Sequence, residues 1–141
     1  MPTDAQYQEM LYTPAHYDDA AKRNFHRAAK TLLQRLAKRL DQTWSSSAQA
    51  GYGEHDPIRS NKGGIAVSGE ITLHYDRLYI QVSQSVMGNN SGILYRSCNG
   101  RKDYCGGQNH FAPLSALVTT EEFARLIESR IPLTIDMGKS A

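Results

Sequence analysis

The residues best suited to chemistry lie in one short stretch, residues 95–110, which reads YRSCNGRKDYCGGQNH. Its cations supply the charge that phosphate or carboxylate recognition requires. These cations are Arg96, Arg101 and Lys102. The glycines let backbone N–H groups approach a ligand closely, and Tyr95 and Tyr104 add flat faces on which a base or sugar could stack. The stretch predicts a polar binding loop, and the alternative is a solvated hairpin tip around Asn99.

The same stretch gives little support for catalysis or metal binding. Cys98 and Cys105 flank the NGRKDY hexapeptide and could face each other across a hairpin, but in a reducing compartment free thiols are expected, and the absence of CxxC spacing disfavours zinc. A zinc site needs about four ligands, and only His110 lies near the pair. The chain has no GxSxG, HExxH or Walker motif, and no base is placed beside a nucleophile. We therefore expect a protein that is not an enzyme and that holds no metal or cofactor.

The composition is that of a small protein with one strongly basic segment. The 141 residues are expected to form a single domain, residues 1–141, with a formal net charge of +2. The basic segment favours an anionic partner, although a solvated helix face is the commoner explanation. Its cations are Lys22, Arg23, Arg27, Lys30, Arg35, Lys38 and Arg39. No segment reaches the roughly 20 apolar residues of a membrane span, and the N-terminus is polar, so a cytoplasmic protein without a membrane partner is expected.

One long helix is expected over residues 14–44. Thr13 followed by Pro14 is typical of a helix start, and apolar residues then recur at three- and four-residue spacing as far as Leu40. Such a helix would be roughly 45 Å long, which exceeds the diameter of a compact chain of this size. The excess predicts that its apolar stripe packs against a second copy in a homo-oligomer. His26 is expected to be a solvated polar residue on this helix.

An antiparallel sheet is expected after a loop at residues 45–62, which are small, polar and glycine-bearing. Alternating apolar residues predict a hairpin of residues 71–75 and 78–83, and another strand from Ile93. Residues 65–67 are a candidate for a further short strand. The sheet region, residues 63–118, has connections too short for helical crossovers, so its three to five strands are expected to be antiparallel.

A short helix is expected at residues 119–131, followed by a polar tail at 132–141. Thr119 and Glu122 predict a capping box at its start. The predicted fold class is therefore α+β, with a long N-terminal helix, an antiparallel sheet and a short C-terminal helix.

A ligand-binding role explains more of these residues than catalysis does. The solvent face of the predicted hairpin carries Tyr79, Gln81 and Ser83, and aromatic, amide and arginine side chains together suit a nucleotide. Asp103 is expected to pair with Arg101 and to hold its guanidinium still. The predicted ligand-binding residues are Arg23, Arg27, Tyr79, Asn89, Arg96, Arg101, Asp103 and Tyr104. The two helix arginines among them would reach the site at an oligomer interface.

The order of these features resembles the first-described Thoeris anti-defence sponge family, phage proteins that trap cyclic ADP-ribose signals. The resemblance lies in a basic helix, a strand aromatic, an asparagine turn and an Arg-x-Asp element at residues 101–103. It implies a small, cytoplasmic, oligomeric protein that sequesters an anionic nucleotide, of the cyclic ADP-ribose type or a cyclic oligonucleotide, without chemistry. The implied phosphate contacts are Arg27 or Arg23 together with Arg101, the implied stacking residue is Tyr79, and Asn89 is a further polar contact.

Other functions remain as alternatives. Residues 22–39 could follow the phosphate backbone of a single-stranded nucleic acid while Tyr79, Tyr95 and Tyr104 stack on its bases. The near-neutral net charge argues against this function. Inhibition of a host complex by surface contact, as an anti-CRISPR protein does, is a third possibility, and catalysis on a nucleotide is a fourth.

Overall fold

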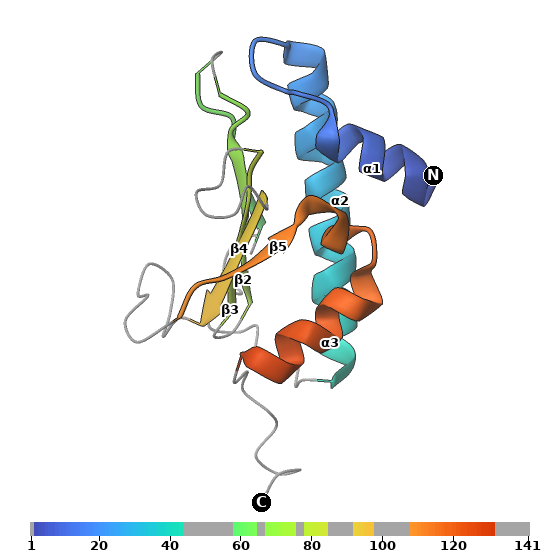
Figure 1. Cartoon of the computed structure of the whole chain (residues 1–141), viewed down its shortest axis with the longest axis vertical. Helices are drawn as coiled ribbons and strands as arrows, with labels where there is room; N and C mark the ends of the chain where they lie inside the picture. The colour runs from blue at the N-terminus through green and yellow to red at the C-terminus, as the bar shows by residue number, and fades with distance from the viewer. Residues whose placement is uncertain are drawn as a thin grey trace, which may run out of the picture.

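The protein is an α+β structure with one layer of helices packed on one sheet (Figure 1). The computed structural model describes residues 2–43, 58–64, 67–75, 78–84, 92–97 and 108–131. The helices are α1 (Asp4–Tyr12), α2 (Asp19–Thr43), the 3-10 helix η2 (Leu114–Leu117) and α3 (Thr120–Arg130). The strands are β1 (Ile58–Asn61), β2 (Glu70–Tyr75), β3 (Leu78–Val82), β4 (Gly92–Ser97) and β5 (His110–Pro113). The α+β fold class predicted from the sequence is confirmed.

The sheet is an antiparallel meander in the order β1-β2-β3-β4-β5. The predicted hairpin and the strand after it are confirmed as β2, β3 and β4. The prediction of a loop as far as residue 62 was wrong at its end, because Ile58–Asn61 form the edge strand β1. Only Ile58 of this strand is buried, so its sequence carries no alternation to reveal it. Val67 lies in a bend and not in the predicted short strand, whose other residues lie outside the described ranges.

The sheet turns one face towards the helices and the other away from them. Alternate residues of β2 and β3, among them Leu73 and Ile80, are fully buried on the inner face. Tyr95 lies on the same inner face, fully buried, with its ring 5.4 Å from that of Phe123 in α3. The expectation that Tyr95 offers an exposed face for stacking was therefore wrong, because the register of β4 points its side chain into the core.

The single N-terminal helix predicted over residues 14–44 is in fact two helices. Thr13 ends α1, because its N–H and its hydroxyl both donate to the Glu9 carbonyl at 2.9 Å and 2.7 Å. Asp18 begins α2, where its Oδ1 accepts the Ala21 N–H at 3.0 Å. Between them Tyr17 has a φ of 60° and an exposed side chain. Pro14 therefore follows one helix and does not begin the next.

Gln84, just after β3, holds the connection between α1 and α2. Its Nε2 donates to the carbonyls of Leu11 and Thr13, at 2.9 Å and 2.7 Å. Its Oε1 accepts the Ala15 N–H at 2.9 Å. One amide side chain thus satisfies two carbonyls at the C-terminal end of α1 and one N–H of the connection that follows it.

The division into two helices removes the argument for a second copy. The 25 residues of α2 span about 37 Å, and α1 packs across the helix within the same chain. The apolar residues of the α2 stripe, such as Phe25, Leu32 and Leu36, are fully buried in the monomer. Homo-oligomer formation stays a prediction that the length of α2 does not support.

A fork of hydrogen bonds joins α2 to α3. Arg39 donates through Nε and Nη2 to the two carboxylate oxygens of Glu121, at 2.7 Å and 2.9 Å, and its Nη1 lies 3.3 Å from Glu128. These bonds lower the pKa of the Glu121 carboxyl. The bidentate geometry fixes the angle between the helices more narrowly than a single ion pair does.

The capping box expected at Thr119 and Glu122 does not form. The Thr119 side chain makes no cap bond, because its hydroxyl points back to the Ala116 carbonyl of η2 at 3.4 Å. A capping box is present at α1 instead, where Thr3 Oγ1 accepts the Gln6 N–H and Gln6 Oε1 accepts the Thr3 N–H.

Thr3→Ala is accordingly expected to lower the free energy of unfolding by about 1 kcal/mol, since it removes the cap of α1. Thr119→Ala is the matched control, and its loss should stay below about 0.5 kcal/mol because no cap bond is removed. Urea unfolding of the two variants measures both values. Equal losses would contradict the assignment of the two caps.

Candidate functional site

The outer face of the sheet carries a row of polar and aromatic side chains. His74 of β2 pairs with Tyr79 of β3, and Tyr79 pairs in turn with Arg96 of β4. Their side chains share the outer face because the neighbours Leu73, Ile80 and Tyr95 are buried on the inner one. We call His74, Tyr79 and Arg96, with Gln81 and Asn109 beside them, the outer-face row.

Short contacts order the outer-face row. The rings of His74 and Tyr79 have centroids 4.9 Å apart with an angle of 57° between their planes. The Tyr79 hydroxyl donates to Gln81 Oε1 at 3.1 Å. Arg96 donates from Nη1 to Asn109 Oδ1 at 2.9 Å and from Nε to its neighbour's carbonyl at 3.3 Å. The guanidinium is therefore held in place one strand away from an aromatic ring.

An aromatic ring beside a guanidinium is the pair of groups that would suit a flat anionic ligand. Cross-strand neighbours have their Cβ atoms about 5 Å apart, so a ring stacked on Tyr79 brings its substituents within reach of Arg96. A hollow of about 290 Å³ lies further along the same face, lined in part by Asn61, Glu70 and Ser83. Its carboxylate and amide oxygens would accept hydroxyl protons of a sugar.

The predicted site residues fall into three groups. Tyr79 and Arg96 are brought together in the outer-face row. Arg23 and Arg27 are exposed on α2, which packs on the opposite face of the sheet, so they cannot join these two within one chain. The others, Asn89, Arg101, Asp103 and Tyr104, lie outside the described residues, as do Cys98 and Cys105.

A buried polar cluster that sequence reasoning missed joins α2 to the end of β1. His26 is 5% exposed, and its Nδ1 lies 2.6 Å from Ser60 Oγ. Its Nε2 lies 2.8 Å from the Ser68 carbonyl, which can only accept, so Nε2 carries the proton and Nδ1 accepts from Ser60. The expectation of a solvated His26 was wrong. Burial lowers the pKa of the imidazole, and the nearby cations of Lys62 and Lys22 lower it further, while the Ser68 bond opposes them.

Lys22 completes this cluster. Only 6% of the residue is exposed, and its Nζ donates to the carbonyls of Lys62 and Gly64, at 3.1 Å and 2.8 Å. Lys22 was predicted to be part of a basic surface, but its ammonium group instead donates to these backbone carbonyls. We call Lys22 and His26, with Ser60, Ser68 and the carbonyls at 62 and 64, the polar latch. Its sequence signal is the spacing of four residues, which puts both side chains on one side of α2.

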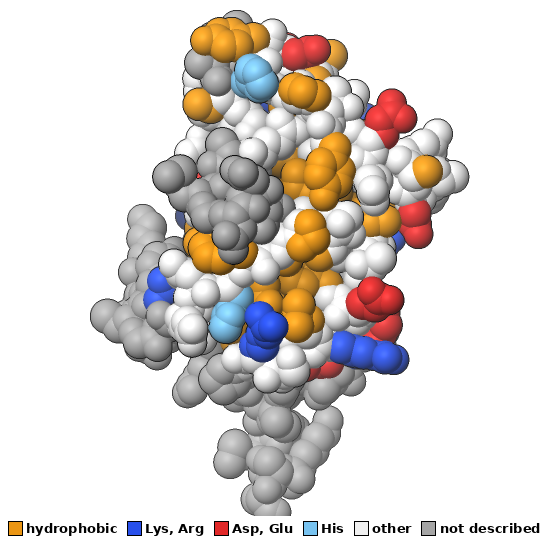
Figure 2. Space-filling view, viewed as in Figure 1, with side chains coloured by type: hydrophobic (Ala, Val, Ile, Leu, Met, Phe, Trp, Pro, Cys, Tyr) orange, Lys and Arg blue, Asp and Glu red, His pale blue; other side chains and the backbone are white. Residues whose placement is uncertain are grey.

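A second cluster lies between β4, β5 and α3. The Tyr95 hydroxyl accepts from Arg130 Nη1 at 3.3 Å, and the His110 ring stacks on Tyr95 at 5.2 Å. Burial raises the pKa of the Tyr95 hydroxyl. Burial also lowers the pKa of the His110 imidazole, and the nearby charge of Arg130 lowers it further. Figure 2 shows that hydrophobic side chains form a band along the middle of the molecular face in this view. Arg130 is an exposed residue at the end of α3, and its guanidinium lies over the Tyr95 hydroxyl at the edge of the core.

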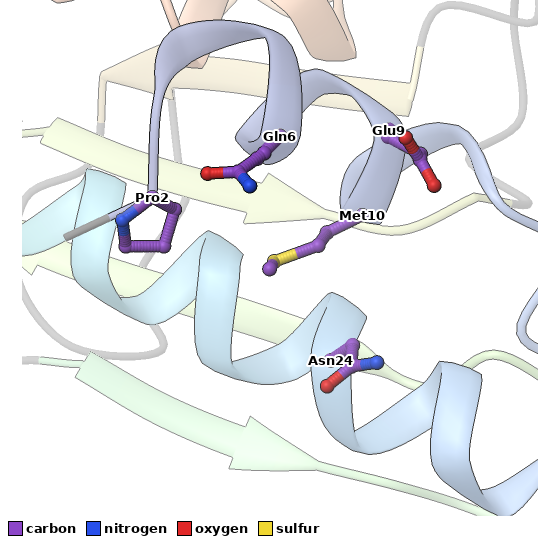
Figure 3. Close-up of a pocket in the computed structure, with 5 residues that line it drawn as sticks. All are labelled: Pro2, Gln6, Glu9, Met10 and Asn24. Atoms are coloured by element: carbon purple, nitrogen blue, oxygen red, sulfur yellow. The ribbon is translucent and has the colours of Figure 1, made fainter.

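A groove runs between α1 and α2. Two adjoining hollows, of about 470 Å³ and 230 Å³, share Glu9, Met10 and Asn24 in their lining. Figure 3 shows the Met10 thioether between the two helices, with Gln6 and Glu9 above it on α1. Glu9 and Asp18 both line the smaller hollow, but the Asp18 carboxylate already accepts the Ala21 N–H at the start of α2. No histidine is among the described residues of this lining, so the groove offers hydrogen bonds and a small apolar floor.

The described part of the chain contains no group of three or more His, Cys, Asp or Glu side chains that could hold a metal ion. No helix among the described residues is both long and apolar enough to cross a membrane. The fold and the outer-face row define an α+β protein with a polar, aromatic sheet surface. Comparison with protein-family models, with curated proteins and with solved structures found no match.

Proposed function

We propose that this protein binds an anionic nucleotide-like small molecule on the outer face of its sheet and sequesters it unchanged. The observation that carries the proposal is the cross-strand pairing of Tyr79 with Arg96. The ring supplies a stacking surface for a base, and the guanidinium supplies the fork that phosphate recognition uses. The proposal involves no chemical step on the ligand, and recovery of the unchanged ligand tests this.

The sequence resemblance to the Thoeris anti-defence sponges leads to the same class of ligand, a cyclic ADP-ribose type signal or a cyclic oligonucleotide. Under this proposal Asn89, Arg101, Asp103 and Tyr104 would add contacts to the row. Arg27 or Arg23 could contribute only from another copy of the chain, because α2 packs on the inner face. The homo-oligomer and the cytoplasmic location expected from the sequence belong to this proposal.

Binding is tested by thermal unfolding with cyclic ADP-ribose, ADP-ribose and a cyclic dinucleotide, followed by chromatography of the ligand released by heat. A ligand at 100 times its Kd stabilises the native state by about 2.7 kcal/mol and raises Tm. Recovery of the unchanged ligand is the expected result, and recovery of a product would contradict sequestration.

Arg96→Ala and Tyr79→Ala should each weaken binding by about tenfold or more, since each removes one of the two recognition elements. Arg125→Ala is the matched control, because its side chain is 73% exposed on α3, away from the sheet. Titration calorimetry gives the three Kd values. Wild-type affinity in both row variants would remove the outer-face row from the site.

A further inference from the structure

Ser60 and His26 of the polar latch form a hydrogen-bonded pair of a nucleophile and a base. Ser60 Oγ lies 2.6 Å from His26 Nδ1, within the range of about 2.6–3.2 Å over which a general base takes up a proton. The histidine is 5% exposed, whereas Ser60 is an exposed residue of the edge strand β1. The base is therefore shielded from water, while the serine beside it is accessible from solvent.

The imidazole is held in the orientation and the tautomer that a general base needs. Its Nε2–H donates to the Ser68 carbonyl at 2.8 Å, which leaves the lone pair of Nδ1 for the Ser60 hydroxyl. The buried Phe25 ring meets the imidazole edge-on, with the ring centroids 5.6 Å apart. A nucleophile, a base and a group that orients the base thus follow one another, which is the order of contacts that activates a serine.

The surroundings of His26 favour the neutral imidazole, the form in which it can accept a proton. Burial lowers the pKa of His26 and outweighs the opposing effect of the Ser68 bond. The charges that act on the imidazole are those of Lys62, just after β1, and Lys22, on α2, and both lower its pKa further. The same two cations would stabilise the negative charge that develops on a carbonyl oxygen when a hydroxyl attacks it.

We propose that Ser60 and His26 catalyse the hydrolysis of carboxylic esters with short acyl groups, at a site separate from the outer-face row and independent of the proposed function. Ser60 pairs with Ile71, which is fully buried on the inner face, so the Ser60 side chain points towards α2 and away from the row. A short acyl group suits an exposed serine at a sheet edge, because it needs no deep apolar cavity to enclose it.

The reaction has two steps, and water is its second reactant. First, Ser60 Oγ attacks the carbonyl carbon while its proton passes to His26 Nδ1, and the alcohol leaves with that proton as the acyl ester of Ser60 forms. Water then gives a proton to His26 Nδ1 and attacks the acyl carbon, Ser60 Oγ leaves with that proton, and the carboxylic acid is released. In both steps the Ser68 carbonyl accepts from Nε2–H and stabilises the imidazolium.

The test treats the full-length protein with a fluorophosphonate, which phosphonylates activated serines with loss of fluoride, and locates the label by peptide mapping. Ser129 is the internal control, because it is also exposed but its hydroxyl donates to the Leu126 carbonyl at 2.7 Å. We expect the label on Ser60 and not on Ser129. An unlabelled Ser60 in the folded protein, or equal labelling of the two serines, would overturn the proposal.

Hydrolysis of 4-nitrophenyl acetate tests the same pair by rate. Ser60→Ala should lower the rate constant by about 100-fold, the scale of general-base catalysis, while Ser129→Ala should leave it unchanged. An unchanged Tm confirms that each variant folds, and an unchanged rate in Ser60→Ala would refute the proposal. Ser60→Ala should also bind cyclic ADP-ribose as the wild type does, so the two proposals fail separately.

The pH profile of the wild type distinguishes a catalytic His26 from a merely structural one. Because the pKa of His26 lies below its ordinary value of 6.5, the rate should reach a plateau by about pH 7 and fall to half at a pH below 6.5. A rate that rises steadily up to pH 9 would show that Ser60 reacts without His26 as its base, and the proposal would then be wrong.

Discussion

Gly69→Ala is expected to lower the free energy of unfolding by about 3 kcal/mol, because an alanine side chain has no room there. Gly69 has a φ of 77°, which a residue with a Cβ atom adopts only with strain. A Cβ at this position would lie 2.4 Å from the Asn61 carbonyl oxygen and 2.8 Å from His26 Nε2. The first neighbour is backbone of β1 and the second is the latch imidazole, so relief of the clash must separate β1 from α2.

Gly64→Ala is the matched control for this prediction. Gly64 lies in the same connection, but a Cβ added there would meet nothing within 4 Å. Its carbonyl remains available to Lys22 Nζ, so the free energy of unfolding should change by less than about 0.5 kcal/mol. Urea unfolding followed by circular dichroism measures both variants. A loss of the same size in each would mean that chain flexibility, and not the clash at Gly69, sets the effect.

The central hairpin could be predicted because its alternation is strict. Leu78, Ile80 and Val82 face the core while the residues between them face outward. Strict alternation of this kind indicates a strand with one buried face. The break between α1 and α2 could not be read in this way, because Pro14 fits either the start of a helix or the residues after one. The choice depends on Gln84, which donates to the Leu11 and Thr13 carbonyls at the C-terminal end of α1 and lies 71 residues from Thr13 along the chain. Sequence patterns carry no information on such a distant hydrogen bond.

The candidate site shows the same division. Tyr79 and Arg96 could be nominated from residue type, but their pairing follows from a register that only the folded sheet defines. The seven cations of residues 22–39 looked like one surface, although Lys22 turns inward to the polar latch and Arg39 turns to α3. Cations in the same segment of sequence therefore differ in what they contact in the folded protein. These cations differ in their burial and in their hydrogen-bond partners, which a single sequence does not reveal.

The polar latch makes the stability of this protein depend on pH. Burial depresses the pKa of His26 in the folded state, whereas the unfolded chain has the ordinary value near 6.5. Below pH 6.5 the unfolded state therefore binds more protons than the native state, and stability falls as the pH falls. The loss ends once the pH drops below the folded-state pKa. His110, whose pKa is also lowered, adds a contribution of the same sign.

His26→Leu should remove both the latch bonds and the pH dependence that they create. At pH 8 the variant is expected to lose about 3 kcal/mol, because the Ser68 carbonyl would stay buried without its donor. Between pH 6.5 and 5 the difference between wild type and variant should narrow, since only the wild type loses the His26 contribution. Urea unfolding at pH 8, 7, 6 and 5 measures the difference, and Gly64→Ala, which keeps the imidazole, should follow the wild-type profile. A gap that stays constant with pH would mean that folding does not shift the pKa of His26. A gap that widens as the pH falls would mean that the folded protein holds His26 charged, with both ring nitrogens donating, and that the tautomer assigned from the Ser68 contact is wrong.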